Sequence, residues 1–594
     1  MPGNNRVDNI FKGTTLLALI GLISSCAPPG AKVAEKLHTL FDDYWQWRLE
    51  ENPEFATYLG DDRYNDRLSD VSLEAFDNRY RQRREFLERL AGLDSSRLSE
   101  NDRLNTRLFS LLLTRRVEAH QYRDFLMPIN QMGGLQIDLP NLVNVTPFRH
   151  SRDYDAYLDR LRAIPGYVDQ TVILMKQGLE EGRVYPAVVL ETVPDQIQAQ
   201  FDLDPEKSPF YDPFTRMPSG MPDTLQKRYR KEALDVLQSR VFPAFRKLRA
   251  FFVETYLPGA RKDIAVTNLP AGEDYYRFLV KYHTTTDLTP EQIHAMGLGE
   301  VGRIRAEMEA ILKEVGFEGS FEEFLTFLRT DPRFYYTREE DLLDGYRIIC
   351  KRADPELAKL FGTLPRTPYG VKAIPEYQAP ASPTAYYYPP SADGSRPGYF
   401  WANTYRLDMR PKYEMEALAL HEAVPGHHLQ IALAMELEGV PEFRKHTGFT
   451  AFTEGWGLYA ESLGEEMGFY TDPYSRFGQL TYEMWRACRL VVDTGMHALG
   501  WSRQEAIDFM KENTAKTEHD IAVEIDRYIA WPGQALAYKM GELKIKELRA
   551  MAGRKLGEKF DIREFHDVVL GSGSLPLTVL EQQVRAYVAG KGQS

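Results

Sequence analysis

Two histidines and a glutamate in an apolar segment have the spacing of metal-binding residues. His421 is followed by Glu422, and His427 and His428 come soon after, within a largely apolar run from Tyr413 to Leu437. In zinc hydrolases, the sequence His-Glu-x-x-His places two imidazoles one helical turn apart and the glutamate beside the metal-bound water. The pattern predicts a zinc site with Glu422 as the general base.

The second histidine comes too late for an unbroken helix. At about 100° and 1.5 Å per residue, His427 would lie on the wrong side of a straight helix, and His428 about 10 Å further along. Pro425 cannot donate a hydrogen bond to the carbonyl of His421, and Gly426 relaxes the backbone, so we expect a bulge. A bulge that absorbs two residues brings His427 to the place of the second ligand. We favour His427 over His428, which would then face the substrate or a neighbour of the ligands.

A third metal ligand is expected shortly after this segment, because a catalytic zinc usually has three protein ligands and one open position. Glu454, in the sequence Thr-Glu-Gly-Trp, falls on the next predicted helix, and Glu461 follows two turns later on the same face. We predict His421, His427 and Glu454 as the ligands and Glu461 as a carboxylate that orients a ligand. The alternative is a kinked helix with solvated imidazoles.

These two segments carry a family resemblance. His-Glu-Ala-Val-Pro-Gly-His-His-Leu-Gln followed by Thr-Glu-Gly-Trp-Gly-Leu-Tyr-Ala-Glu resembles the bacterial family known as domain of unknown function 885, over most of the chain. That family resembles the helical glutamate-zincins, which include angiotensin-converting enzyme, oligopeptidases and thermostable carboxypeptidases. This chain differs from those relatives by two residues inserted between Glu422 and the Gly-His pair.

The resemblance implies a mainly α, two-lobed zincin-like fold, with a deep cleft and a small β-sheet beside the metal helix. It implies zinc-dependent hydrolysis of peptide bonds in short peptides, as a carboxypeptidase, a dipeptidase or an oligopeptidase. The same zinc machinery could instead cut a non-peptide amide. A metal-free binding lipoprotein that has lost catalysis is a further alternative, although such a protein has no need of Glu422.

Residues late in the chain are candidates for binding the substrate and its oxyanion. In the zincins a late tyrosine donates a hydrogen bond to the oxyanion, and by resemblance this role falls to Tyr538 or Tyr528. His497, one turn after Asp493, could share that role, although a surface ion pair is the commoner reason for this spacing. Arg527 could bind a substrate carboxylate through two parallel hydrogen bonds.

Two aromatic segments, Ala385 to Pro390 and Gly398 to Thr404, are the clearest strand candidates. By resemblance to the zincins, an edge strand should lie beside the metal helix and pair with an extended substrate backbone. Asn403 is a candidate substrate contact there. A hairpin without a binding role explains the two segments equally well.

The remainder of the chain has mainly helical patterns. Ser99 and Thr289 are each followed by capping residues, and Pro290 stands at the expected first position of a helix. We expect a boundary near Asp287, which divides an N-terminal helical lobe, residues 26–286, from a catalytic lobe, residues 287–594.

The first 25 residues are typical of a bacterial lipoprotein signal peptide. Arg6 and Lys12 precede an apolar stretch from Leu16 to Ile23, and Ile-Ser-Ser-Cys ends at Cys26. The apolar stretch is too short to span a membrane. Cleavage before Cys26 and acylation of its sulfur would anchor the protein to a membrane of the cell envelope, facing the periplasm. Ordinary secretion is the alternative.

The composition narrows the choice of partners. With 594 residues, 43% hydrophobic and 27% charged, the chain can form two or three domain-sized cores. A net charge of −13 without a basic, aromatic-rich cluster argues against nucleic acid as a partner. Peptides are the partners that the family resemblance implies. Besides Cys26 only Cys350 and Cys488 are present, so we predict no disulfide framework and leave their pairing open. The sequence does not indicate the oligomeric state.

Overall fold

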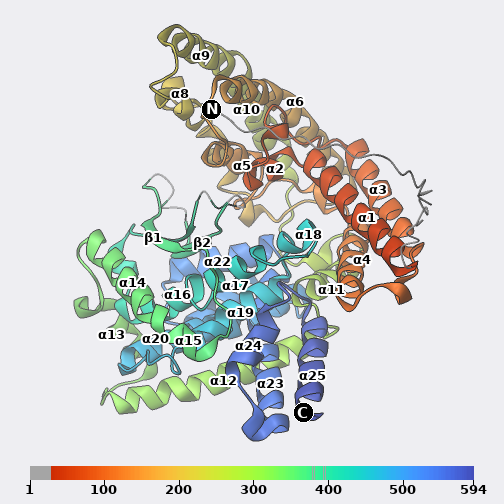
Figure 1. Ribbon diagram of the computed structural model, residues 1–594. Helices are drawn as coiled ribbons and strands as arrows, with labels where there is room; N and C mark the ends of the chain where they lie inside the picture. The colour runs from red at the N-terminus through yellow and green to blue at the C-terminus, as the bar shows by residue number, and fades with distance from the viewer. Residues whose placement is uncertain (1–28, 377–378, 380–381, 392–393, 395, 594) are drawn as a thin grey trace, which may run out of the picture.

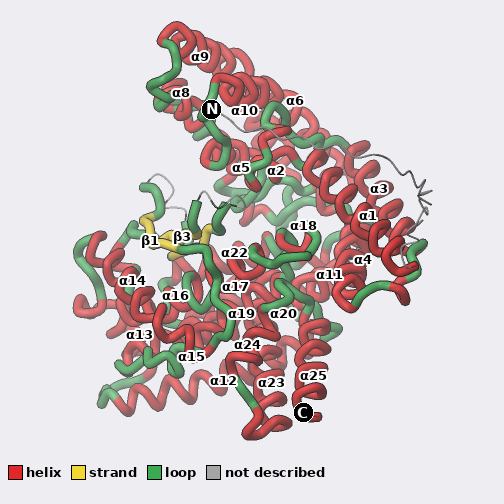
Figure 2. The backbone as a smooth tube through the Cα atoms, viewed as in Figure 1, coloured by secondary structure: helices red, strands yellow, loops and turns green. Residues whose placement is uncertain are grey.

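The computed structural model describes residues 29–376, 379, 382–391, 394 and 396–593. This part of the chain is predominantly helical, with strands on one side only (Figures 1 and 2). The predicted signal peptide and Cys26 lie outside it. No helix within these described ranges is long and apolar enough to cross a membrane.

Eleven α-helices precede residue 286 in the described part of the chain. Ser99 caps α4 as predicted, because its hydroxyl accepts a hydrogen bond from the backbone N–H of Asp102. The bounds are α1 Pro29–Glu51, α2 Pro53–Leu59, α3 Leu73–Ala91, α4 Glu100–His120, α5 Leu135–Asn141, α6 Ser151–Glu181, α7 Val193–Gln198, α8 Asp212–Thr215, α9 Asp223–Val236, α10 Phe242–Phe251 and α11 Gly272–Thr284.

The second half begins with the capped helix that the sequence predicted. Thr289 and Gln292 exchange side chain to backbone hydrogen bonds, and Pro290 is the first residue of α12. The bounds are α12 Pro290–Glu314, α13 Phe321–Thr330, α14 Glu339–Ala353, α15 Leu357–Leu360, α16 Met415–Glu422, α17 His427–Met435, α18 Glu442–Lys445, α19 Thr450–Ser462, α20 Pro473–Ala498, α21 Arg503–Asn513, α22 Glu518–Ala530, α23 Ala537–Leu556, α24 Ile562–Leu570 and α25 Leu577–Gln593.

A three-stranded sheet lies against the broken helix α16–α17. It consists of β1 Tyr369–Ala373, β2 Ala385–Tyr388 and β3 Gly398–Ala402, in the order β1-β3-β2, with β1 parallel and β2 antiparallel to β3. The two aromatic segments are strands as predicted, whereas β1 was not predicted. The edge strand β2 packs against α16, and β3 packs against α17.

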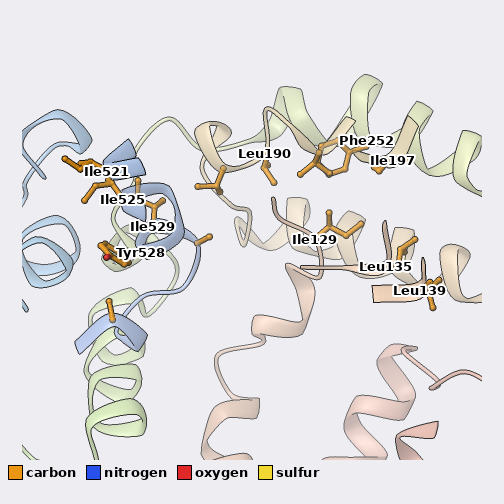
Figure 3. Packing of buried hydrophobic residues seen from close by; sticks show 14 of the residues in the cluster. Ile129, Leu135, Leu139, Leu190, Ile197, Phe252, Ile521, Ile525, Tyr528 and Ile529 are labelled. Carbon is orange, nitrogen blue, oxygen red and sulfur yellow. The ribbon is translucent and has the colours of Figure 1, made fainter. Parts of the chain in front are cut away.

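Each large hydrophobic core combines both halves of the chain. One core joins residues between 129 and 256 to residues between 301 and 535, and the other joins residues 37–113 to residues between 342 and 588. Figure 3 shows part of the first core, with Ile129 and Leu190 on one side and Ile525 and Tyr528 of α22 on the other. In Figure 1, α1 to α10 occupy the upper and right-hand regions, and the remaining helices with the sheet occupy the lower region. The predicted border near Asp287 therefore does not separate two cores.

The helix that carries Glu454 crosses α23 at close backbone distance. Gly455 of α19 faces Gly541 of α23, and a Cβ atom at either glycine would overlap the backbone of the opposite helix. This crossing fixes α19 relative to α23 without intervening side chains. It therefore determines where Glu454 lies.

Candidate metal centre

The apolar segment breaks into two helices at the predicted position. α16 ends at Glu422 and α17 begins at His427, so the connection is a complete interruption rather than the bulge we expected. Glycine is required at position 426, because a Cβ atom there would overlap the carbonyl oxygens of Leu420 and His421.

Trp456 of α19 holds this connection in place. Its indole Nε1 donates a hydrogen bond to the carbonyl oxygen of Pro425 at 2.8 Å, and its ring is fully buried. The break is thus attached directly to the helix that carries the third predicted ligand. Trp456 belongs to the Thr-Glu-Gly-Trp motif, but this role was not predicted.

The three predicted ligands converge. His421 Nε2 and His427 Nε2 lie 3.9 and 3.5 Å from the same Glu454 oxygen, Oε2. One donor atom of each residue lies within 4.8 Å of the other two, and no other such group of histidine, cysteine or carboxylate side chains occurs in the described part of the chain. Two imidazole nitrogens and one carboxylate oxygen are a ligand set that catalytic zinc sites use.

Glu461 orients His421 as predicted for a supporting carboxylate. Its Oε1 lies 2.7 Å from His421 Nδ1, and both residues are buried. Burial raises the pKa of Glu461 to about 8. Gly457 leaves room for the ring, because a Cβ atom there would come within 2.7 Å of His421 Cε1. With Nδ1 engaged by Glu461, Nε2 is the ring nitrogen that faces Glu454.

The polar groups of the cluster differ in their hydrogen-bond partners and in the direction of their pKa shifts. Burial disfavours charge on His427 and Glu454, yet their hydrogen bond raises the pKa of His427 and lowers the pKa of Glu454. The buried Nδ1 of His427 has no partner within the described residues. Burial raises the pKa of Glu422, whose carboxylate accepts a hydrogen bond from the backbone N–H of Tyr387 in β2.

His428 points away from the cluster, toward the sheet. Its Nδ1 lies 2.9 Å from the hydroxyl of Tyr387, and its Nε2 lies 3.1 Å from the carbonyl oxygen of Thr367. Burial lowers the pKa of His428 to about 4. Because both ring nitrogens have protein partners, the predicted substrate contact of His428 has no support, and the side chain connects α17 to the sheet.

His497 does not form the predicted pair with Asp493. Its Nδ1 accepts a hydrogen bond from Val266 N–H at 3.2 Å, and its Nε2 lies 3.0 Å from the carbonyl oxygen of Tyr528. Asp493 instead accepts hydrogen bonds from the Tyr276 hydroxyl at 2.6 Å and from a backbone N–H. Neither nitrogen of His497 is left to donate to an oxyanion, so the catalytic role predicted for it is wrong.

Two further predicted contacts are engaged within the chain. The Nη atoms of Arg527 lie 3.2 Å from Glu524 Oε2 and 2.7 Å from Gln534 Oε1. The buried hydroxyl of Tyr528 accepts a hydrogen bond from Arg489 Nε at 2.8 Å. The polar groups of Arg527 and Tyr528 are therefore bonded to other residues of the protein, and their predicted contacts with substrate have no support.

Tyr538 differs from Tyr528 in exposure and in its contacts. The Tyr538 side chain is half-buried, and the guanidinium carbon of Arg489 lies 4.5 Å from the centre of its ring. No protein hydrogen bond to its hydroxyl is found within the described ranges. Of the two predicted tyrosines, Tyr538 is the one whose hydroxyl remains available to a ligand.

Asn403 makes hydrogen bonds to the loop that precedes β2. Its amide nitrogen donates to the carbonyl oxygens of Ala379, Ser382 and Pro383, and its oxygen accepts from the backbone N–H of Tyr405. The residue is only 1% exposed. Its predicted contact with substrate therefore has no support.

The sequence analysis missed two buried arginines near the cluster. Arg486 and Arg489 lie one turn apart on α20, 7% and 5% exposed. Arg486 Nη2 lies 3.7 Å from Glu461 Oε1. An Arg-x-x-Arg pair inside a long apolar helix was a usable signal, because a buried guanidinium is costly unless it has specific partners.

The structure defines a mainly α-helical protein with a small mixed sheet and a cluster of two histidines and a glutamate at a helix break. The chain belongs to the family described as bacterial protein of unknown function (DUF885), which matches residues 53–584. The match confirms the resemblance of the two motifs to this family, and the resemblance to the zincins stays a prediction.

Two solved structures share this fold. One is a "putative lipoprotein" from Colwellia psychrerythraea, with 29% identity and a TM-score of 0.89, covering 94% of this chain and 99% of that one. The other is a "putative lipoprotein of unknown function" from Shewanella oneidensis, with 18% identity and a TM-score of 0.72, covering 93% and 99%. None of the curated proteins matches the chain.

Proposed function

We propose that this protein is a zinc metallopeptidase that hydrolyses peptide bonds in short peptides. The observation that carries the proposal is the convergence of His421, His427 and Glu454, with ligand atoms within 4.8 Å of one another. Glu461 behind His421 and Glu422 beside it complete the set of groups that a zinc hydrolase needs. The buried Nδ1 of His427 and the buried Oε2 of Glu461 have no hydrogen-bond partner among the described residues.

In this proposal His421 Nε2, His427 Nε2 and Glu454 hold the metal. When bound, zinc supplies a Lewis acid for the scissile carbonyl and lowers the pKa of a water toward about 7. Glu422 accepts a proton from the attacking water and later passes it to the leaving amine. Tyr538 donates a hydrogen bond to the oxyanion, because its hydroxyl has no hydrogen-bond partner in the part of the chain that the structure describes.

The edge strand β2 is the proposed docking site for the substrate backbone. Asn403 N–H donates to the carbonyl oxygen of Thr384, so in the alternating antiparallel pattern Tyr387 directs its N–H and C=O away from β3. That N–H reaches Glu422. An extended peptide lying along β2 would therefore pass next to the general base, in the cleft that we propose between two lobes.

The proposed location is the cell envelope, with the protein attached through Cys26 and facing the periplasm. The lipoprotein-type sequence before Cys26 supports this, as do the descriptions of the two similar solved structures as lipoproteins. Peptides that enter or arise in that compartment would be the substrates.

The test combines metal content with turnover. Elemental analysis of the purified protein, prepared without chelator, is expected to show about one zinc per chain. A mixture of short peptides is expected to be cleaved, and Glu422→Gln should lower kcat by at least about 100-fold while zinc stays bound, because general base catalysis contributes about 10²- to 10⁴-fold.

Three results would overturn parts of the proposal. Absence of zinc after zinc is offered would remove the metal centre, and unchanged turnover in Glu422→Gln would remove the mechanism. A zinc protein that cleaves a non-peptide amide but no peptide would keep the chemistry and replace the substrate class.

A further inference from the structure

A buried arginine beside the metal cluster has one donor group without a protein partner. Arg489 Nε donates to the Tyr528 hydroxyl at 2.8 Å, and Nη2 lies 3.2 Å from Glu524 Oε2. Its Nη1 is buried and has no partner among the described residues. An unsatisfied buried N–H group is costly, and in a guanidinium held at its other two nitrogens it is a natural binding point for a ligand.

The surroundings of Arg489 favour an anionic ligand. A single carboxylate, Glu524, serves both Arg489 and Arg527, so one positive charge of the pair is not balanced. Arg486, one turn before Arg489 on α20, lies 3.7 Å from Oε1 of Glu461, the carboxylate that contacts His421. The guanidinium of Arg489 also lies over the ring of Tyr538, 4.5 Å from its centre. The unbalanced charge is therefore next to the proposed metal site.

We propose that Arg489 binds the free C-terminal carboxylate of the peptide substrate through Nη1, an inference that rests on the proposed function. Carboxylates are the anions for which a planar guanidinium is best shaped. Since Arg489 lies beside the metal ligands, a C-terminus bound there places a bond near the end of the peptide at the metal. The enzyme then removes short C-terminal pieces, as a carboxypeptidase or dipeptidase does.

Arg527, which the sequence analysis favoured for this role, is a positioning residue in this account. Its two Nη groups hold Glu524 and Gln534, and Glu524 in turn holds Arg489 Nη2. Arg527 thus acts on the substrate carboxylate only through Arg489.

The test uses pairs of peptides that differ only in a free or an amidated C-terminus. The wild-type enzyme should prefer the free acid by about 10- to 100-fold in kcat/KM, because hydrogen bonds to charged groups contribute that much. Arg489→Gln should bring the acid-to-amide ratio close to one, mainly through KM for the acid. Arg489→Lys should give an intermediate ratio, since it keeps the charge and loses the planar fork.

Two controls separate this inference from other effects. Arg476 lies on the same helix and pairs with Glu465 at the surface, so Arg476→Gln should keep the wild-type ratio of acid to amide cleavage. Binding is measured by calorimetry on zinc-loaded Glu422→Gln, where the acid form should bind about 10- to 100-fold more tightly than the amide. That measurement requires neither turnover nor a stable Arg489 variant.

The outcomes distinguish the two proposals. Cleavage of acid and amide peptides at equal rates, or equal binding of both, overturns the role of Arg489 and leaves the metallopeptidase intact. A protein that binds the acid form selectively but cleaves no peptide overturns the proposed function and keeps the carboxylate site.

Discussion

Two regions of the protein have a buried histidine near a carboxylate, and the two histidines use their ring nitrogens differently. At the helix break, His421 uses Nδ1 for Glu461 and directs Nε2 toward Glu454 and His427. On α20, His497 uses both ring nitrogens for backbone groups of other segments. A histidine can therefore bind a ligand only if its neighbours leave one ring nitrogen unused. The spacing of residues along a helix does not determine whether a nitrogen is left unused.

Substituting adjacent histidines tests the comparison most strongly. His427→Ala should abolish stoichiometric zinc binding, because it removes one of three ligands. His428→Gln should keep about one zinc per chain, since the ring of His428 faces Tyr387 and Thr367. The measurement is zinc per chain after dialysis against metal-free buffer. If His428→Gln loses zinc and His427→Ala keeps it, His428 and not His427 is the metal ligand.

Substituting Glu461, near His421, and Asp493, near His497, should also have different effects on zinc binding. The expected difference is smaller than for the histidine variants. Glu461→Gln should weaken zinc binding by about 10- to 100-fold, the usual effect of losing the partner of a metal-bound histidine. Asp493→Asn should leave zinc affinity unchanged, because Asp493 contacts Tyr276 and a backbone N–H instead of a histidine. Competition with a chelating dye gives both affinities. Equal affinities in the wild type and Glu461→Gln would contradict the orienting role.

The smallest expected effect concerns stability against pH. Burial lowers the pKa of His497 to about 4, against an ordinary value of about 6.5. The folded state therefore binds fewer protons than the unfolded state between these pH values. The stability that neutral His497 contributes is fully present above about pH 6.5 and is lost as the pH falls toward about 4, by roughly 1.4 kcal/mol per pH unit.

His497→Gln removes this titration. The variant should be less stable than the wild type at pH 7, and its free energy of unfolding should fall less steeply between about pH 6.5 and 4.5. Urea unfolding at several pH values measures the slopes, and the other buried histidines contribute equally to both proteins. Identical slopes would mean that His497 is not held neutral in the fold.

The sequence predicted those features that depend on local residue types. The caps at Ser99 and Thr289, the two aromatic strands and the convergence of His421 with Glu454 follow from short motifs and helical periodicity. β1 was missed because Tyr369–Ala373 is stabilised by parallel pairing with β3, a contact between residues far apart in the chain.

The same limit explains the errors at the site. The prediction for His497 failed because Val266 and Tyr528, which occupy its ring nitrogens, are brought there only by the tertiary fold. Arg527 was predicted to bind a carboxylate because a guanidinium can make two parallel hydrogen bonds, and no role was predicted for Arg489. Which guanidinium keeps a free donor depends on Glu524 and Gln534, and no spacing rule gives that.

The shared cores have a consequence for how the protein acquires its final form during synthesis. Leu37 of α1 and Val584 of α25 belong to the same core as Leu420 and Trp456, which flank the metal ligands. All three ligands have been synthesised once residue 454 is added to the chain, yet the last helix is still missing from the core around them. Assembly of the site is therefore a late, post-translational event that brings both ends of the chain together.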